Sequence, residues 1–580
     1  MEKEIKQVIA EALSVLYEIK SSKDRIQIQK TRKEFAGDYT FNVFPFLKEI
    51  RKAPEQAGNE IGQFLVEKGG LVHAFNVIKG FVNLEIKQDN WIDILNTIAQ
   101  SDFNLPEKNE KVVIEYSSPN TNKPLHLGHI RNNLLGDSLS RILKASGRDV
   151  IQVNLVNDRG IHICKSMLAW EKWGNGETPE NAGLKGDKLV GNYYVKFDQE
   201  NKKLVSDNNE ETELLKEARE MLRKWEKGDE KVCALWEKMN NWVYKGFEET
   251  YKRLGITFDK IYYESETYKL GKDKVLKGLE KGILLQKDDQ SVWADLTDHK
   301  LDEKILLRAD GTSVYMTQDI GTAILRHQDF SPNKMIYVVG NEQDYHFTVL
   351  KIVLKKLGYE WSEFIEHFSY GMVELPHGKM KSREGTVVDA DDLMEEVVAQ
   401  ARKMAEESDK LSYLSEEEKA NVFELIGLGA LKYYILKVDP RKNMMFNPEE
   451  SVQLQGNTGP FIQYSYARSK SVLRKAAEQN IIIPERIDEG NPDEKEVQII
   501  KLLADYKSVL EEAGKVMSPA LIANYAFTLA KEFNQFYYDH AILKEENEQI
   551  RNLRLLITAV FGEVIKHALS LLGITSPERM

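Results

Sequence analysis

The feature that most constrains the fold of this chain is a strand–helix–strand pattern between residues 112 and 156. VVIEY at 112–116 is a short apolar run, a helical pattern follows from about 128 to 143, and DVIQVNLV at 149–156 is a second apolar run. KMIYVVG at 334–340 has the same character. Buried strands that alternate with helices are typical of βαβ units, so we predict an α/β core built on a parallel sheet.

The length of 580 residues predicts more than one domain. We expect boundaries near 105 and 440, which divide the chain into residues 1–105, 106–440 and 441–580. The first segment mixes helical spacing with strand pieces such as FVNLEI at 81–86, and it ends in a polar stretch. From about 420 onward the pattern is almost wholly helical, which predicts an all-helical last domain.

Composition excludes several classes of protein. Cys164 and Cys233 are too few for a disulfide framework or a four-cysteine zinc site, so we expect no structural metal. No apolar run reaches the length of a membrane span, and the first twenty residues lack the core of a signal peptide. These observations favour a cytoplasmic protein with free thiols.

The net charge of −12 argues against broad, non-specific binding of a polyanion. If the chain binds nucleic acid, the binding surface must be a local basic stripe, with aromatic side chains contributing part of the recognition.

The segment KPLHLGH at 123–129 joins the first strand to the predicted helix. Backbone N–H groups and the dipole at a helix N-terminus attract anions, here at the edge of a parallel sheet where ligands bind. Gly128 allows close approach of a nucleotide, while His126 and His129 share one face of the first turn. We interpret the segment as a phosphate site; the alternative is a satisfied surface pair of histidines.

A second segment, GKMKSREGT at 378–386, is a basic loop bounded by glycines. Positioned cations stabilise the charge that develops as a phosphoryl bond breaks, although a basic loop alone is usually a solvated turn. Together, in this order and spacing, the two segments resemble the paired signature of class I aminoacyl-tRNA synthetases, usually written HIGH and KMSKS.

Within that class the chain resembles arginyl-tRNA synthetases over nearly its whole length. The other matching segments are GDY at 37–39, EYSSPN at 115–120, YMTQD at 315–319, GNEQ at 340–343, NTGPFIQY at 457–464, LGI at 572–574 and PERM at 577–580. The resemblance implies a Rossmann-type catalytic domain at 106–440. It also implies an N-terminal α+β accessory domain that contacts tRNA, and a helical domain that reads the anticodon.

The implied reaction is arginine–tRNA ligation for protein synthesis. Arginine and ATP would give arginyl-adenylate and pyrophosphate, and the arginyl group would pass to the 3′-terminal adenosine of tRNA(Arg). Magnesium would enter with ATP, and the expected partners are tRNA(Arg), L-arginine and ATP. From the family, and because no coiled coil is evident, we expect a monomer.

The resemblance assigns a catalytic role to residues of both motifs. They are Lys123, His126, His129, Lys379 and Arg383. The residues that would bind ATP are Lys123, His126, Gly128, His129, Gly371, Met372, Lys379, Met380, Lys381 and Ser382. The second motif departs from the family pattern because Ser382 replaces its fourth-position lysine. Lys123 is well placed to supply that cation, and Lys381 could simply be solvated.

A pocket that selects a guanidinium should supply carboxylates, because this group stays charged and offers five donors in a planar fork. The positions that match the family's arginine site are Glu115, Ser118, Asn120, Glu264, Tyr315, Asp319 and Gln343. The alternative for Glu264 is a solvated surface charge, as for most acidic residues of such a chain. Asp158 and Gly160 match a family loop and would shape the site near the acceptor end, or would form a turn with no ligand role.

The resemblance also places tRNA contacts in the two flanking domains. The expected contact residues are Phe81, Asn83, Phe461, Tyr464, Tyr466, Arg468 and Met580. Helical-core packing is the alternative for about half of the C-terminal aromatic cluster, since apolar rings at helical spacing pack inward.

Three other readings compete with this one. A class I synthetase for another amino acid would share both motifs, although a cysteine enzyme would require a zinc pocket. Small nucleotidyltransferases use a similar histidine turn but are much shorter. A tRNA-binding paralogue without activity is disfavoured by the intact His126, Gly128, His129, Lys123 and Asp319.

We predict that the protein charges an arginine tRNA in the presence of MgATP and arginine. An aminoacylation assay with each of the twenty amino acids checks this, and a preference for any amino acid other than arginine contradicts it.

Overall fold

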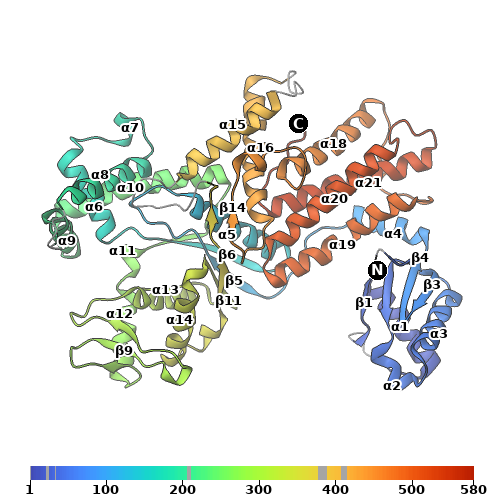
Figure 1. Ribbon diagram of the computed structural model, residues 1–580, viewed down its shortest axis with the longest axis horizontal. Coiled ribbons are helices and arrows are strands. Elements are labelled where there is room, and N and C mark those ends of the chain that lie inside the picture. The colour runs from blue at the N-terminus through green and yellow to red at the C-terminus, as the bar shows by residue number, and fades with distance from the viewer. Residues whose placement is uncertain (1, 21–24, 33, 205–210, 377–387, 407–413) are drawn as a thin grey trace.

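The computed structural model describes residues 1–580 except 1, 21–24, 33, 205–210, 377–387 and 407–413. The N-terminal domain is a four-stranded antiparallel sheet of order β1-β2-β4-β3, covered by helices (Figure 1). Its strands are β1 (Ile28–Lys30), β2 (Tyr39–Asn42), β3 (Val72–Ile78) and β4 (Phe81–Ile86). Its helices are α1 (Glu2–Tyr17), α2 (Leu47–Ile50) and α3 (Pro54–Lys68).

The centre of the molecule is a five-stranded parallel sheet of order β12-β11-β5-β6-β7. Its strands are β5 (Lys111–Glu115), β6 (Asp149–Val156), β7 (Lys260–Tyr263), β11 (Lys334–Gly340) and β12 (Ile365–Tyr370), with α5 (Leu127–Ala145) joining the first two. The predicted βαβ unit is confirmed. The chain builds outward from β5 through β6 to β7 and then returns to the other side of β5, so the strand order switches between β5 and β11. Ligands of open parallel sheets bind outside the carboxyl ends of strands at such a point.

Two insertions between strands of this sheet lie on the left of Figure 1. Between β6 and β7 lie α6 (Ile161–Trp173), α7 (Pro179–Ala182), α8 (Gly186–Leu204), α9 (Glu213–Glu226) and α10 (Glu230–Leu254). Between β7 and β11 lie α11 (Glu264–Thr267), α12 (Leu270–Glu280), β8 (Leu285–Gln286), β9 (Val292–Ala294), β10 (Lys304–Leu307) and α13 (Tyr315–Phe330). Both begin at the carboxyl edge of the sheet, so they form walls around the switch point.

The remainder of the chain is almost entirely helical, as predicted. After α14 (Asp344–Lys356), β12 and β13 (Val373–Glu374) come α15 (Ala390–Glu406), α16 (Glu416–Leu436), β14 (Met444–Met445), α17 (Pro448–Ser451), α18 (Gly459–Glu478), α19 (Glu494–Val516), α20 (Pro519–Asp539) and α21 (Glu548–Leu571). The C-terminal helices pack together on the right of Figure 1, beside the N-terminal domain.

Helix α4 (Gln88–Ala99) packs with the C-terminal helices although it lies within the first predicted segment. The Asn96 side chain donates to the Ile487 carbonyl at 2.7 Å and accepts from the Ile487 N–H at 2.9 Å. Trp91, Ile92 and Leu95 are buried there. The boundary near 105 therefore marks the start of the parallel sheet, whereas the N-terminal sheet itself ends with β4 near Ile86.

Helix α5 connects the sheet to the C-terminal helices. Gly136, in its middle, faces the Tyr116 ring, where an added Cβ would lie 2.2 Å from a ring carbon. Two residues later, the Ser138 hydroxyl donates to the Leu571 carbonyl at the end of α21, at 2.9 Å. Glycine normally weakens a helix interior, so close packing accounts for Gly136.

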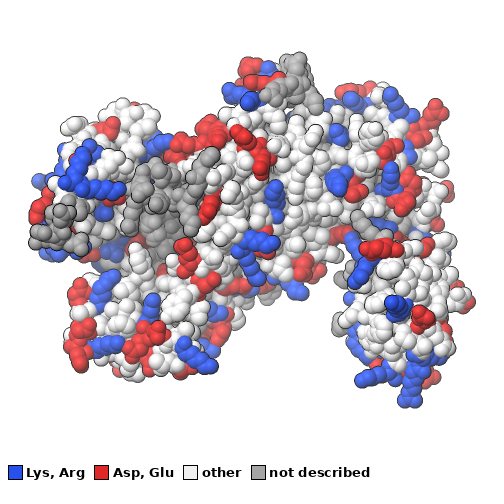
Figure 2. Space-filling view, in the orientation of Figure 1, with Lys and Arg blue, Asp and Glu red and all other residues white. Residues whose placement is uncertain are grey.

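Charge is mixed over the face of the molecule in Figure 2. Figure 2 shows Lys and Arg interspersed with Asp and Glu over most of this face, and basic side chains gather at the end of the N-terminal domain where α2 lies. Among the described helices, none is both long and apolar enough to cross a membrane.

Substituting Gly136→Ala should destabilise the protein by about 1–3 kcal/mol, because the methyl group meets a buried ring that cannot move away. Gly562→Ala in α21 is the matched control, since its Cβ meets mainly the rotatable Ser469 hydroxyl at 3.0 Å. Chemical denaturation of both variants measures the effect, and equal losses of stability would show that the ring contact is not the cause.

Candidate active site

The carboxyl end of β5 leads into a backbone turn held in an uncommon conformation. Ser117 and Ser118 have φ of 79° and 46°, which is the left-handed region that costs non-glycine residues about 1–3 kcal/mol each. Asn132 Oδ1 accepts from the Ser117 N–H at 2.5 Å, and Asn154 Oδ1 accepts from the Ser118 N–H at 3.0 Å. These buried amides fix the turn beneath the predicted site.

The two histidines of the first motif cap helix α5. His126 is the N-cap: its Nδ1 accepts from the Gly128 N–H at 3.1 Å, and His129 Nδ1 accepts from the His126 N–H at 3.2 Å. The ring centroids lie 3.9 Å apart. Because each Nδ1 accepts a hydrogen bond, each neutral ring carries its proton on Nε2.

Burial keeps both rings neutral. Burial, and then the neighbouring Lys123, lowers the pKa of His126 to about 3, and burial lowers the pKa of His129 well below its ordinary value. Burial also lowers the pKa of the Lys123 ammonium. The first motif therefore offers two neutral Nε2–H donors beside one lysine.

The chain returns to this motif directly after the second one. The backbone of Asp389 pairs with that of His126, and the Ala390 N–H donates to the Leu125 carbonyl at 2.9 Å. The predicted ATP residues Lys379, Met380, Lys381 and Ser382, together with Arg383, lie outside the described residues. The residues that follow this segment, Asp389 and Ala390, nevertheless contact the histidine motif.

Gly371 and Met372 follow β12 and are held by the segment after α16. The Gly371 N–H donates to the Pro440 carbonyl at 2.9 Å, the Met372 N–H donates to Asn443 Oδ1 at 2.7 Å, and the Met372 carbonyl accepts from the Met444 N–H at 2.9 Å. The backbone N–H of each residue and the Met372 carbonyl are therefore already engaged. The Met372 side chain, in contrast, is exposed and lies near Gly340.

Acidic side chains gather on the other side of the turn. Glu264 begins α11 and Asp319 lies one turn into α13, four residues after Tyr315, whose side chain is 76 % exposed. Burial raises the pKa of Glu264 to about 7; Arg159 opposes this shift, while the charges of Asp158 and Asp319 add to it. Like charges held this close favour binding of a cation between them.

Asp158 fixes the position of Glu264. Its carboxylate accepts from the Ser265 N–H at 2.8 Å, from the Ser265 hydroxyl at 2.6 Å and from the Tyr244 hydroxyl at 2.9 Å. Asp158 is buried, so it is a support for the start of α11 and not a ligand. Gly160 has φ of 105°, and a Cβ added there would meet no atom within 4 Å. Its backbone conformation makes it a turn residue before α6.

Glu115, at the end of β5, lies under the acidic group. Its carboxylate forms a buried ion pair with Arg326 of α13 and accepts from the Ser118 hydroxyl at 3.0 Å. Of the other predicted arginine ligands, Asn120 and Gln343 are exposed at the ends of the β5 loop and of β11. The structure thus brings the predicted arginine ligands to the carboxyl edge of the parallel sheet, where Glu115 is buried beneath the others.

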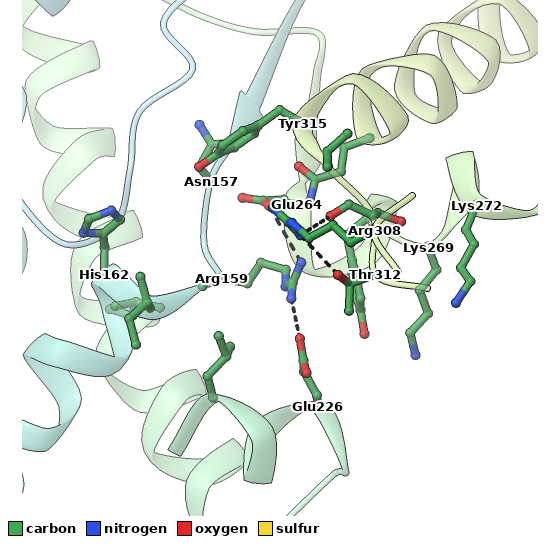
Figure 3. Close-up of a pocket in the computed structure, with 18 of the residues that line it drawn as sticks. Asn157, Arg159, His162, Glu226, Glu264, Lys269, Lys272, Arg308, Thr312 and Tyr315 are labelled. Carbon is green, nitrogen blue, oxygen red and sulfur yellow. Dashed lines mark hydrogen bonds and ion pairs between the residues drawn. The ribbon is translucent and has the colours of Figure 1, made fainter. Parts of the chain in front are cut away.

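A cavity of about 820 Å³ opens beside Glu264 and Tyr315 (Figure 3). Arg159 lies between Glu226, at 2.8 Å, and Glu264, at 3.9 Å. Its guanidinium also covers the Tyr268 ring at 4.0 Å. Lys269, Lys272 and Arg308 also line the cavity, and no described acidic residue lies within ion-pair distance of these three.

Comparisons with known proteins identify the family of this chain. Residues 93–447 match the family described as tRNA synthetases class I (R), catalytic domain. Residues 3–86 match the arginyl tRNA synthetase N terminal domain, and residues 462–580 match the DALR anticodon binding domain. The chain belongs to the arginyl-tRNA synthetase family.

Relatives and solved structures support the same family. The chain is 58 % identical to an arginine–tRNA ligase of Parabacteroides distasonis, with 100 % of each chain covered, and 54 % identical to one of Flavobacterium psychrophilum, with 96 % of each covered. The arginyl-tRNA synthetase structure from Thermus thermophilus shares its fold, with a TM-score of 0.83, 24 % identity and full coverage of both chains. With its class I catalytic domain, the chain is an aminoacyl-tRNA ligase.

The family's N-terminal domain presents one of its two predicted tRNA residues. Phe81 is 37 % exposed and packs edge-on against the exposed Phe44, with ring centroids 5.7 Å apart. Asn83 is only 2 % exposed: its amide accepts from the Thr40 hydroxyl and donates to Asn76 Oδ1. The sheet therefore uses the polar atoms of Asn83 internally, whereas Phe81 faces outward.

In the C-terminal domain, Arg468 lies over the rings of Tyr464 and Tyr537, at 4.9 and 4.8 Å. This group joins α18 to α20 at the surface. Tyr466, on the other face of α18, is buried, as the core-packing alternative expects. Phe461 is partly buried against Phe527. Met580 is partly buried against a cluster from α15 and α16.

One group of described residues brings possible metal ligands together. Atoms of Asp493, Glu496 and His540 lie within 4.8 Å of one another. Asp493 caps α19 and pairs with His540 at 2.6 Å, while Glu496 pairs with Arg554 at 2.7 Å. Protein partners account for the cluster, so it gives no argument for a metal.

Sequence reasoning missed Arg326, His346 and Tyr537. Each contacts a predicted site residue from a helix distant in sequence: Arg326 pairs with Glu115, His346 with Asp319, and Tyr537 with Arg468. No motif marked these residues, although Arg326 and His346 follow predicted site residues within seven positions, at Asp319 and Gln343.

Proposed function

We propose that this cleft forms arginyl-adenylate from arginine and ATP and then transfers the arginyl group to the 3′-terminal adenosine of tRNA(Arg). ATP-dependent ligation of arginine to tRNA is the reaction of the family to which the chain belongs. The observation that carries the residue-level proposal is the pairing of neutral histidines with an acidic group across one sheet edge.

On the ATP side, the Nε2–H groups of His126 and His129 donate to phosphate oxygens, and the α5 dipole adds to their effect. Lys123 supplies a cation that stabilises the negative charge as it moves onto pyrophosphate. Gly128 leaves space for the nucleotide, and Met372 packs against adenine. By family resemblance, Lys379 and Arg383 assist from the second motif, with Met380, Lys381 and Ser382 beside them. Magnesium enters with ATP and needs no protein cage.

On the arginine side, Glu264 and Asp319 accept hydrogen bonds from the guanidinium, and Tyr315 covers its plane. Ser118, Asn120 and Gln343 hold the α-amino and carboxylate groups. Glu115 acts through the Ser118 hydroxyl, since its other interaction is with Arg326. The arginine carboxylate is thereby held in line with the α-phosphate, and this positioning accounts for much of the rate enhancement.

The acceptor end of tRNA enters through the cavity lined by Lys269, Lys272 and Arg308, whose charges attract backbone phosphates. Phe81 meets the tRNA through the N-terminal domain. Tyr464, Arg468, Phe461 and Met580 belong to the surface that meets unpaired anticodon bases by stacking. The enzyme works as a monomer in the cytoplasm.

Asp319→Ala should raise the KM for arginine by about ten-fold or more while changing the KM for ATP by less than about two-fold, because one charge-assisted hydrogen bond to the guanidinium is lost. Pyrophosphate exchange, run with and without tRNA, measures both constants. Equal changes in the two constants would remove Asp319 from the guanidinium pocket.

The kcat/KM for arginine should fall as pH decreases through about 7, to about one-tenth of its pH 8 value at pH 6. The sign follows from Glu264, whose pKa of about 7 in the free enzyme leaves it protonated at lower pH and unable to pair with the guanidinium. The two motif histidines do not titrate in this range. In Glu264→Gln the profile should be flat and low, and an unchanged profile would assign the titration to another group.

A further inference from the structure

The proposed guanidinium ligand Asp319 has a protein partner that no motif identifies. Its Oδ2 lies 2.6 Å from His346 Nε2, between α13 and the first turn of α14. The side chains are 35 % and 20 % exposed, respectively, so the contact lies at the border of the site. Because an ionised carboxylate only accepts hydrogen bonds, the imidazole Nε2–H is the donor.

We propose that His346 is a positioning residue for arginine recognition: its Nε2–H holds one Asp319 oxygen so that the other faces the guanidinium. The proposal rests on the proposed function of Asp319. It adds a residue from another helix, and it states how this carboxylate stays oriented before arginine binds.

Asp319 needs such a partner because its surroundings repel it. Its charge acts on Glu264 and on Glu115, and it raises the pKa of each. An exposed carboxylate in a like-charged group gains by rotating toward water, which costs little along its side-chain torsions. A single directed donor opposes that rotation and preorganises the carboxylate, so less ordering is required on binding.

The type of partner separates the carboxylates of this site by role. Glu115 meets the permanent cation of Arg326, which satisfies its charge within the protein. Asp319 meets an imidazole, which in its neutral form donates a hydrogen bond and leaves the negative charge for the ligand. A lysine or arginine at position 346 would compete with the substrate guanidinium for the same carboxylate.

A structural role confined to α14 does not explain the contact. His346 is the third residue of α14, yet its bonded partner belongs to α13 and not to the exposed backbone of its own helix. The ring also packs edge-on against Phe347, with the two ring centroids 5.7 Å apart.

Three variants test the proposal in pyrophosphate exchange with tRNA present. His346→Ala should raise the KM for arginine about ten-fold, with the KM for ATP within about two-fold. His346→Gln, whose amide can replace the Nε2–H donor, should restore most of the loss. His346→Lys should bind arginine more weakly than His346→Ala, because its ammonium occupies Asp319.

The control is His327→Ala. His327 lies about two turns after Asp319 in α13, and its ring stacks on Trp361 with the centroids 4.5 Å apart. It should leave the KM for arginine unchanged. Thermal unfolding of every variant identifies any that is misfolded, and the comparison of Gln with Lys then stands without the alanine variant. Any of three results would overturn the proposal. They are a KM for arginine in His346→Lys equal to that of the wild type, a KM in His346→Gln as high as in His346→Ala, and an unchanged KM in a folded His346→Ala.

A double-mutant cycle separates this inference from the proposed function. If His346 acts through Asp319, His346→Ala should add less than about two-fold to the KM for arginine in an Asp319→Asn background. If Asp319→Asn alone leaves that KM unchanged, the proposed function of Asp319 fails. If Asp319→Asn is defective and His346→Ala adds its full effect to it, only the positioning role fails.

Discussion

The packing of α5 against the β5 end is the constraint on which the rest of this structure depends. Gly136 allows the helix to approach Tyr116 closely, and this contact sets where the helix N-terminus lies relative to the sheet. The N-terminus then carries the histidine pair, while Ser138 joins the same helix to the end of α21. A shift of this one helix would displace the phosphate donors and the C-terminal domain together.

The second constraint is electrostatic. The site must hold several carboxylates in place, and those that are to bind a ligand must neither turn toward water nor pair fully with a cation of the protein. Arg326 satisfies Glu115, and the hydrogen bonds of Ser265 and Tyr244 satisfy Asp158. Both groups are buried supports. Burial raises the pKa of all three carboxyl groups, but of the three only Glu264 lines the cavity, where a guanidinium can relieve its charge.

The parallel sheet and the histidine turn were predictable because their signals are local: apolar runs of strand length, and a glycine with two histidines at a helix start. The predicted strand at 149–156 and the helix from 128 agree with β6 and α5 within two residues. The burial of Asn83 and Tyr466 was not predictable from the motifs, because a motif gives a residue's identity and not the direction of its side chain. His346 and Arg326 escaped because their partners lie 27 and 211 residues away, a separation that only the fold closes.

Arginine carries a cation at one end and a carboxylate at the other, so the charges of the cleft can orient it as well as bind it. Lys123 and the positive end of α5 lie on the histidine side, whereas Glu264 and Asp319 lie across the β5 turn. In the function that we propose, this arrangement draws the guanidinium away from ATP and leaves the carboxylate facing the phosphates. Neutral imidazoles suit this division, because charged ones would attract the arginine carboxylate itself and compete with the α-phosphate for it. The sequence's acidic total is therefore compatible with its anionic substrates, since the separation of charge within the cleft governs their orientation and the net charge does not.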